Sequence, residues 1–149
     1  MKRREFLSNS MTAGIAAASL TPLVSVADEN EKGTKRFKLN YAPHFNMFKN
    51  TAGTDLIDQL KFASDQGFTA WEDNGMKQRP VELQEKIGRT MEQLGMQMGV
   101  FVAHGSIGKI TFARKDKAVW ETVLQDIRDS IEVAKRVNAK WVTVVPGNV

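Results

Sequence analysis

The chain contains two histidines, and each stands at the end of a predicted strand, as does Glu72. The three strand-like runs lie at 37–45, 68–73 and 96–105, and the side chains at or near their ends are His44, Glu72 and His104. Imidazole and carboxylate groups can hold the hydroxyl groups of a small substrate and exchange protons with them. We therefore take these three residues as candidate substrate-binding groups, and we assign no catalytic residue and no metal ligand.

Each candidate has a structural alternative that the sequence leaves open. His104 could bond a backbone carbonyl in a turn, and Glu72 could cap a helix or pair with a Lys or Arg side chain. Asp73 and Asn74 are residue types that favour turns. Trp71 and Trp141 are interpreted as packing residues, with contact to a ligand as the alternative.

Strands and helices alternate along the sequence from Phe37. The predicted strands are 37–45, 68–73, 96–105 and 141–145, and the predicted helices are 54–67, 79–95 and 116–138. Thr54 is the predicted N-cap of the first helix, and Gly67, Gly95 and Asn138 follow the three helices as stop signals. In the longest helix an apolar stripe recurs at helical spacing and predicts a face turned to the core; it consists of Trp120, Leu124, Ile127, Ile131 and Ala134.

This alternation predicts an α/β fold with a parallel sheet and right-handed crossovers. A nucleotide-binding doubly wound sheet would carry a glycine-rich turn after its first strand, but the loop here is "APHFNMFKNTAGT", with Gly53 as its single glycine. Strand starts recur about every 34 residues, so eight units would need roughly 275 residues, the size of a TIM barrel. The prediction is a (β/α)8 TIM barrel of which residues 37–149 form the first four β-α units, from a longer protein.

Residues 1–27 have the three zones of an export signal. Arg3 and Arg4 precede Phe6 and Leu7, a weakly apolar zone follows, and Ser25-Val26-Ala27 offers small residues for cleavage after Ala27. The arginine pair favours the twin-arginine pathway of bacteria, with a Sec signal as the alternative. We therefore expect a periplasmic protein that is a partner of the twin-arginine export machinery.

The composition of the chain excludes several functional classes. The net charge is +4, and without residues 1–27 the chain keeps 18 basic and 16 acidic residues, so no nucleic-acid partner is expected. The absence of cysteine excludes disulfides, thiol catalysis and zinc held by thiolates. Residues 28–36, "DENEKGTKR", predict a disordered leader between the signal and the domain.

Two short motifs carry a family resemblance. "GFTAWE" (67–72) is similar to the second-strand signature of the xylose isomerase-like barrels, and "LGMQMGVFVAHGS" (94–106) resembles the third-strand segment of their hydroxypyruvate isomerase branch. The resemblance implies an isomerase that interconverts an aldose-type and a ketose-type substrate through an enediol. It also implies a divalent metal, Mg or Mn, whose ligands lie with the two catalytic glutamates on strands five to eight, outside this chain.

On this resemblance the chain is the N-terminal part of an exported sugar or hydroxy-acid isomerase with a small-molecule substrate. The alternative is a non-catalytic carbohydrate-binding or interaction module on a half barrel. A metal-dependent DNA endonuclease of the same superfamily is disfavoured, because that activity uses many histidines and this chain has two. Homo-oligomer formation is left open by the sequence.

Overall fold

The computed structural model describes residues 35–145, 147 and 148. The predicted signal with Arg3, Arg4 and Ala27 lies outside these residues, as does most of the predicted leader. The elements are α1 (Lys49–Ala52), α2 (Leu56–Asp65), β1 (Ala70–Trp71), the 3₁₀ turn η1 (Met76–Gln78), α3 (Val81–Gln93), β2 (Gln97–Met98), β3 (Val102–Gly105), α4 (Lys117–Val137) and β4 (Thr143–Val145). The α/β class is confirmed, with short strands in small parallel sheets.

The three predicted helices are confirmed as α2, α3 and α4, each ending within two residues of its predicted bounds. The predicted N-cap Thr54 is wrong, because the side chain of Asp55 accepts hydrogen bonds from the backbone N–H groups of Ile57 and Asp58. Asp116 caps α4 in the same way. Asn138 adopts the left-handed conformation after α4, with φ of 52°, as its role as a stop signal predicts.

Neighbouring strand segments are parallel and follow the order of the sequence. β1 pairs with β2, with Trp71 opposite Met98, and β3 pairs with β4, with His104 opposite Val144. The predicted strand 96–105 is split, because its first part pairs with β1 and its second part with β4. The run changes partner at residues 99–101, where Gly99 N–H donates to the Trp71 carbonyl and Thr143 N–H donates to the Phe101 carbonyl.

The predicted first strand, 37–45, is reduced to one parallel bridge between His44 and Glu72. Glu72 N–H donates to the carbonyl of Pro43, while Pro43 itself has no N–H with which to continue a ladder. The segment still lies beside β1, so the order of the sequence is kept at this edge.

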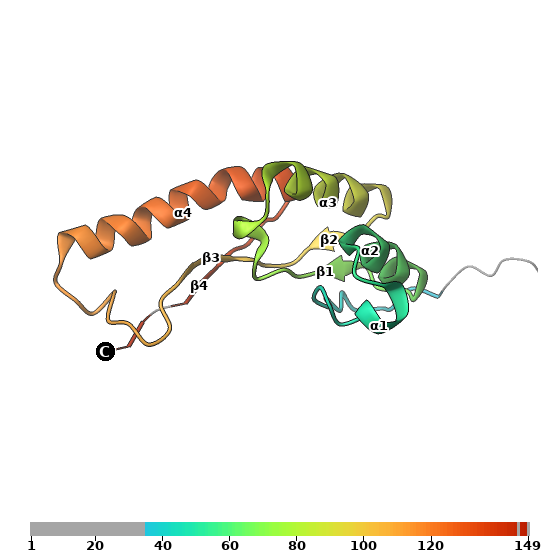
Figure 1. Ribbon diagram of the computed structural model, residues 1–149, viewed down its shortest axis with the longest axis horizontal. Helices are drawn as coiled ribbons and strands as arrows, with labels where there is room; N and C mark the ends of the chain where they lie inside the picture. The colour runs from blue at the N-terminus through green and yellow to red at the C-terminus, as the bar shows by residue number, and fades with distance from the viewer. Residues whose placement is uncertain (1–34, 146, 149) are drawn as a thin grey trace, which may run out of the picture. The chain divides into compact units, whose positions relative to one another are not determined.

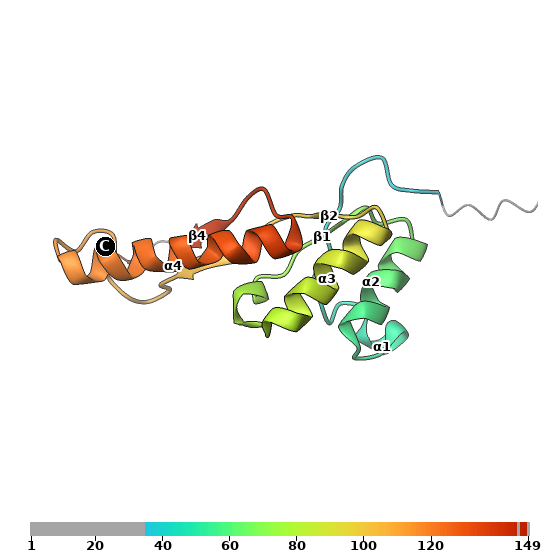
Figure 2. The ribbon, with the colours of Figure 1, turned by 90° about the horizontal axis from the view of Figure 1, so that it is seen from above.

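The core lies between the short strands, α2 and α3. Figure 2 shows α2 beside α3 and α1 beside α2, and the carboxyl end of α4 meets α3 at Gly88. Trp71 is fully buried against Phe45 and Phe48, which supports its interpretation as a packing residue. The buried residues of this core cluster are Phe45, Ile57, Leu60, Ala63, Trp71, Met76, Ile87, Met91, Met96, Met98, Phe101, Val133 and Val137.

The predicted core face of α4 is wrong. Trp120, Leu124 and Ile131 are exposed at 43%, 46% and 52%. The helix buries a neighbouring face instead, formed by Val123, Ser130, Val133 and Val137. Figure 1 shows α4 beside the β3–β4 pair, and its contacts run to β3, α3 and η1. The periodicity identified an apolar stripe correctly but not the side of the helix that the fold covers.

Trp141 is also not a packing residue, because it is 70% exposed just before β4. The described helices contain no segment long and apolar enough to span a bilayer.

Candidate functional site

His44 and Glu72 form the first part of the candidate site. The bridge between their backbones places His44 Nε2 3.3 Å from Glu72 Oε2, and both side chains are about one-third exposed. A Cβ on Gly99 would lie 2.8 Å from Glu72 Cγ, so glycine at this position of the neighbouring segment leaves room for the carboxylate. This pair joins an imidazole and a carboxylate at the carboxyl ends of two adjacent strand segments, within reach of solvent.

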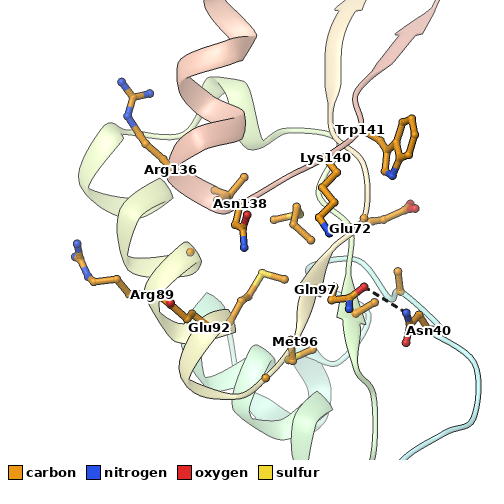
Figure 3. Close-up of a pocket in the computed structure, with 18 of the residues that line it drawn as sticks. Asn40, Glu72, Arg89, Glu92, Met96, Gln97, Arg136, Asn138, Lys140 and Trp141 are labelled. Atoms are coloured by element: carbon orange, nitrogen blue, oxygen red, sulfur yellow. Dashed lines mark hydrogen bonds between the residues drawn. The ribbon is translucent and has the colours of Figure 1, made fainter.

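Glu72 also borders a cavity of about 660 Å³, a size that suits a small ligand. Its polar lining includes Asn40, Gln97, Asn138 and Lys140, and Asn40 Nδ2 donates to Gln97 Oε1 at 3.4 Å. In Figure 3 Lys140 extends into the cavity, whereas the ends of Arg89 and Arg136 turn away from it. Most of these polar residues precede their strands in the sequence, so they line the cavity near the amino ends of the strands. Glu72 follows β1 and is therefore the lining residue that lies at a carboxyl end.

His104 belongs to a second group, at the end of β3. Its Nδ1 lies 2.7 Å from Asp126 Oδ2 on α4, and its Nε2 lies 2.5 Å from Ser106 Oγ. An ionised carboxylate only accepts hydrogen bonds, so Nδ1 carries the proton. In the neutral imidazole Nε2 is then the acceptor, and Ser106 donates its hydroxyl proton to it. The result is a chain of hydrogen bonds from Ser106 through His104 to Asp126.

Lys77 fixes the far end of this chain. Its ammonium group donates to Asp126 Oδ1 at 2.7 Å, to the Asp126 carbonyl at 2.9 Å and to the Ala103 carbonyl at 3.1 Å. The hydrogen bond from Lys77, followed by the one from His104, holds the pKa of Asp126 below its ordinary value. Both groups favour the ionised carboxylate, and they outweigh its partial desolvation. Three elements, η1, β3 and α4, are joined through this one carboxylate.

Asp73 and Arg79 form a third polar contact, next to the candidate pair. Arg79 Nε lies 2.5 Å from Asp73 Oδ2, and its guanidinium lies 4.9 Å above the centre of the Phe45 ring. Asp73 also accepts from the backbone N–H of Gly75, which is the turn geometry that its residue type predicts. The ion pair secures the chain after β1 and leaves Glu72 free to contact His44.

The structure thus brings His44 and Glu72 together and places His104 with a different set of side chains. Sequence reasoning missed Lys77, Ser106 and Asp126. Ser106 could have been noticed, because it follows His104 by two residues at the end of a strand. Asp126 carries no such signal: it lies 22 positions from His104 on the polar-looking part of a helix, and only the packing of α4 on β3 brings the two together.

In residues 35–145, 147 and 148, no group of three or more His, Asp or Glu side chains is arranged to hold a metal ion. No protein-family model, curated protein or solved structure matches this chain.

Proposed function

We propose that residues 37–149 are the N-terminal part of a xylose isomerase-like (β/α)8 barrel, and that the protein is an exported sugar or hydroxy-acid isomerase of the hydroxypyruvate isomerase type. The observation that carries the proposal is the order of the strand segments. Each is parallel to the next in sequence order, and His44, Glu72 and His104 all stand at carboxyl ends. In a barrel built in this order, the carboxyl ends form the substrate-binding face.

In this role His44 and Glu72 orient the substrate directly, and His104 does so through Ser106. His44 and Glu72 supply one donor and one acceptor side by side, which suits a hydroxyl next to a carbonyl. The family resemblance assigns the C–H proton transfer to two glutamates on later strands and the polarisation of the carbonyl to Mg or Mn. The described residues offer no cluster for such a metal, so no step here depends on it.

The proposal is tested by isomerase assays with hydroxypyruvate and with a ketose. In the full-length enzyme, His44→Ala, Glu72→Gln and His104→Ala should each lower kcat/KM roughly ten- to a hundredfold, the usual effect of losing one positioning hydrogen bond. The melting temperature should change little for His44→Ala and Glu72→Gln, because both side chains reach solvent. The 149-residue chain alone should show no turnover with added Mg²⁺ or Mn²⁺, and metal-dependent turnover by it would contradict this assignment of the glutamates.

Export is tested separately. Changing Arg3 and Arg4 to lysine should retain the precursor in the cytoplasm, and the mature N-terminus should be Asp28. Periplasmic accumulation of the Lys-Lys variant at the normal level would exclude the twin-arginine pathway.

A second candidate function is supported by Trp141. This exposed indole lies at the cavity that Asn40, Gln97 and Asn138 line, and amides beside an exposed aromatic ring suit carbohydrate binding without catalysis. Binding of a ketose by the 149-residue chain, weakened by Trp141→Ala and accompanied by no turnover in the full-length protein, would favour this module over the isomerase.

A further inference from the structure

In the hydrogen-bonded series at the end of β3, the donor and acceptor of each bond are fixed. Lys77 holds Asp126 as a carboxylate, Asp126 accepts from His104 Nδ1–H, and His104 Nε2 accepts from the Ser106 hydroxyl. Each group fixes the next, so the basic lone pair of the imidazole points at the Ser106 oxygen. The hydrogen bond that Nδ1 makes to Asp126 sets which ring nitrogen carries the proton, and it leaves Nε2 as the acceptor.

His104 and Ser106 within this group are also buried. The His104 side chain is 9% exposed and Ser106 is 5% exposed, while the edge-on Phe112 ring lies 6.3 Å from the imidazole, centre to centre. Asp126 Oδ1 and the Ala103 carbonyl are both occupied by Lys77. The imidazole and the Ser106 hydroxyl are therefore sheltered from bulk water, whereas the Asp126 side chain, 37% exposed, reaches it.

We propose that Ser106 and His104 form a proton relay for a substrate hydroxyl, and that Asp126 and Lys77 are the residues that position His104 for it. The inference rests on the proposed isomerase function and specifies its ligand chemistry: an α-hydroxy carbonyl compound whose hydroxyl reaches Ser106 Oγ.

The relay supplies a step that aldose–ketose interconversion requires. Besides the C–H proton, a proton must leave the hydroxyl oxygen of the substrate and a proton must reach its carbonyl oxygen. The substrate hydroxyl gives its proton to Ser106 Oγ while the Ser106 proton passes to His104 Nε2, which leaves a substrate alkoxide and an imidazolium. Asp126 stabilises the imidazolium through Nδ1–H. The proton then returns along the same path to the other oxygen, so nothing is oxidised or reduced overall.

The positioning part of the proposal is tested by ¹⁵N NMR of the histidine rings in the 149-residue chain. With two histidines in the sequence, His44→Gln assigns both rings. Wild-type His104 should carry its proton on Nδ1 at neutral pH, and Asp126→Asn should shift part of the population to the Nε2–H form.

Asp129→Asn is the matched control, since Asp129 lies on the same helix and contacts Gln125. Lys77→Met should also shift the His104 tautomer population toward the Nε2–H form, but less than Asp126→Asn does. It serves as the second variant if Asp126→Asn does not fold. An Nε2–H tautomer in the wild type, or equal spectra for the Asp126 and Asp129 variants, would overturn the proposal.

The relay itself is tested with ligands and with kinetics. Hydroxypyruvate should move the His104 Nε2 resonance, whereas pyruvate, which lacks the hydroxyl, should not. In the full-length enzyme Ser106→Ala should lower kcat/KM roughly ten- to a hundredfold. The control Ser130→Ala should lower it far less, because this buried serine bonds the Asp126 carbonyl rather than His104. Equal effects of the two serine variants, or an unmoved His104 resonance, would exclude the relay while leaving the isomerase proposal intact. Absence of turnover in the wild-type enzyme would instead contradict the isomerase and with it the role of the relay, while the tautomer experiment would still report the positioning of His104.

Discussion

Residues 37–101, here called the packed region, and residues 102–148, here called the open region, use the same kinds of element with different results. In the packed region α2 and α3 turn their apolar faces toward β1, β2 and each other, and Leu60, Trp71 and Ile87 are fully buried. In the open region α4 is the longest helix, yet much of its apolar stripe is exposed, and Ile107 and Trp141 are exposed at 86% and 70%.

The difference shows that an amphipathic helix has the capacity for burial without determining its partner. α4 is anchored mainly by its last turns, where Val133 and Val137 join the core, and by the Asp126 contacts with Lys77 and His104. Polar contacts next to the buried Val123 therefore hold the middle of α4, whereas α2 and α3 are held mainly by apolar packing.

The largest expected difference between the two regions is in the free energy of unfolding that the same truncation costs in each. Leu60→Ala removes a fully buried side chain from α2 and should lower the free energy of unfolding by about 2–5 kcal/mol. Leu124→Ala makes the same chemical change on α4, where the side chain is 46% exposed, and should cost about 0.5 kcal/mol or less. Urea denaturation of both variants checks this, and similar losses would mean that the stripe of α4 is covered in solution.

Gly88 lies where the two regions meet. A Cβ on this glycine would lie 2.2 Å from the carbonyl oxygen of Arg136, so Gly88→Ala must push α3 and α4 apart. We expect a loss of about 1–3 kcal/mol in the free energy of unfolding. Gly75→Ala is the control, because the nearest atom to its added Cβ lies 3.6 Å away. A neutral Gly88→Ala would indicate that α4 does not pack on α3 at this point.

The exposed apolar residues of the open region predict self-association of residues 28–149. The stripe of α4 and the short strand β4 both offer surface to another molecule. Light scattering should detect dimers or larger species at micromolar concentration, and Leu124→Lys should reduce them, whereas Lys61→Glu on α2 should not. A monodisperse wild-type monomer with a cooperative melt would contradict this expectation and count against the half-barrel proposal.

The smallest expected effect concerns acid stability in the open region. The pKa of Asp126 is lowered in the folded state, so its ionised form stabilises the fold above its unfolded value of about 3.9, and this contribution disappears as the pH falls through the folded value. Lys77→Met removes the main cause of the shift. The loss of stability between pH 7 and pH 3 should become smaller than in the wild type, by less than about 1 kcal/mol because Asp126 is 37% exposed. An unchanged pH dependence in a urea titration would show that Lys77 does not stabilise the carboxylate.

Local signals allowed much of the fold to be predicted. Capping residues and periodicity located the three main helices, and the alternation of elements predicted the parallel pairing. The strands were less predictable, because a strand depends on its neighbours. Residues 37–45 have one edge beside β1 and contain Pro43, so a strand-like pattern yields a single bridge. Residues 96–105 change partner midway, which no local pattern records.

The sequence by itself determined where α4 begins and ends, because Asp116 and Asn138 satisfy its terminal backbone groups locally. It also determined that His44, Glu72 and His104 stand at strand ends. Only the tertiary structure decided that His44 contacts Glu72, that His104 contacts Asp126, and that the Val123–Val137 face of α4 is the buried one. The physical reason is that caps and periodicity depend on residues within a turn of one another, whereas side-chain partners depend on which elements pack together in space.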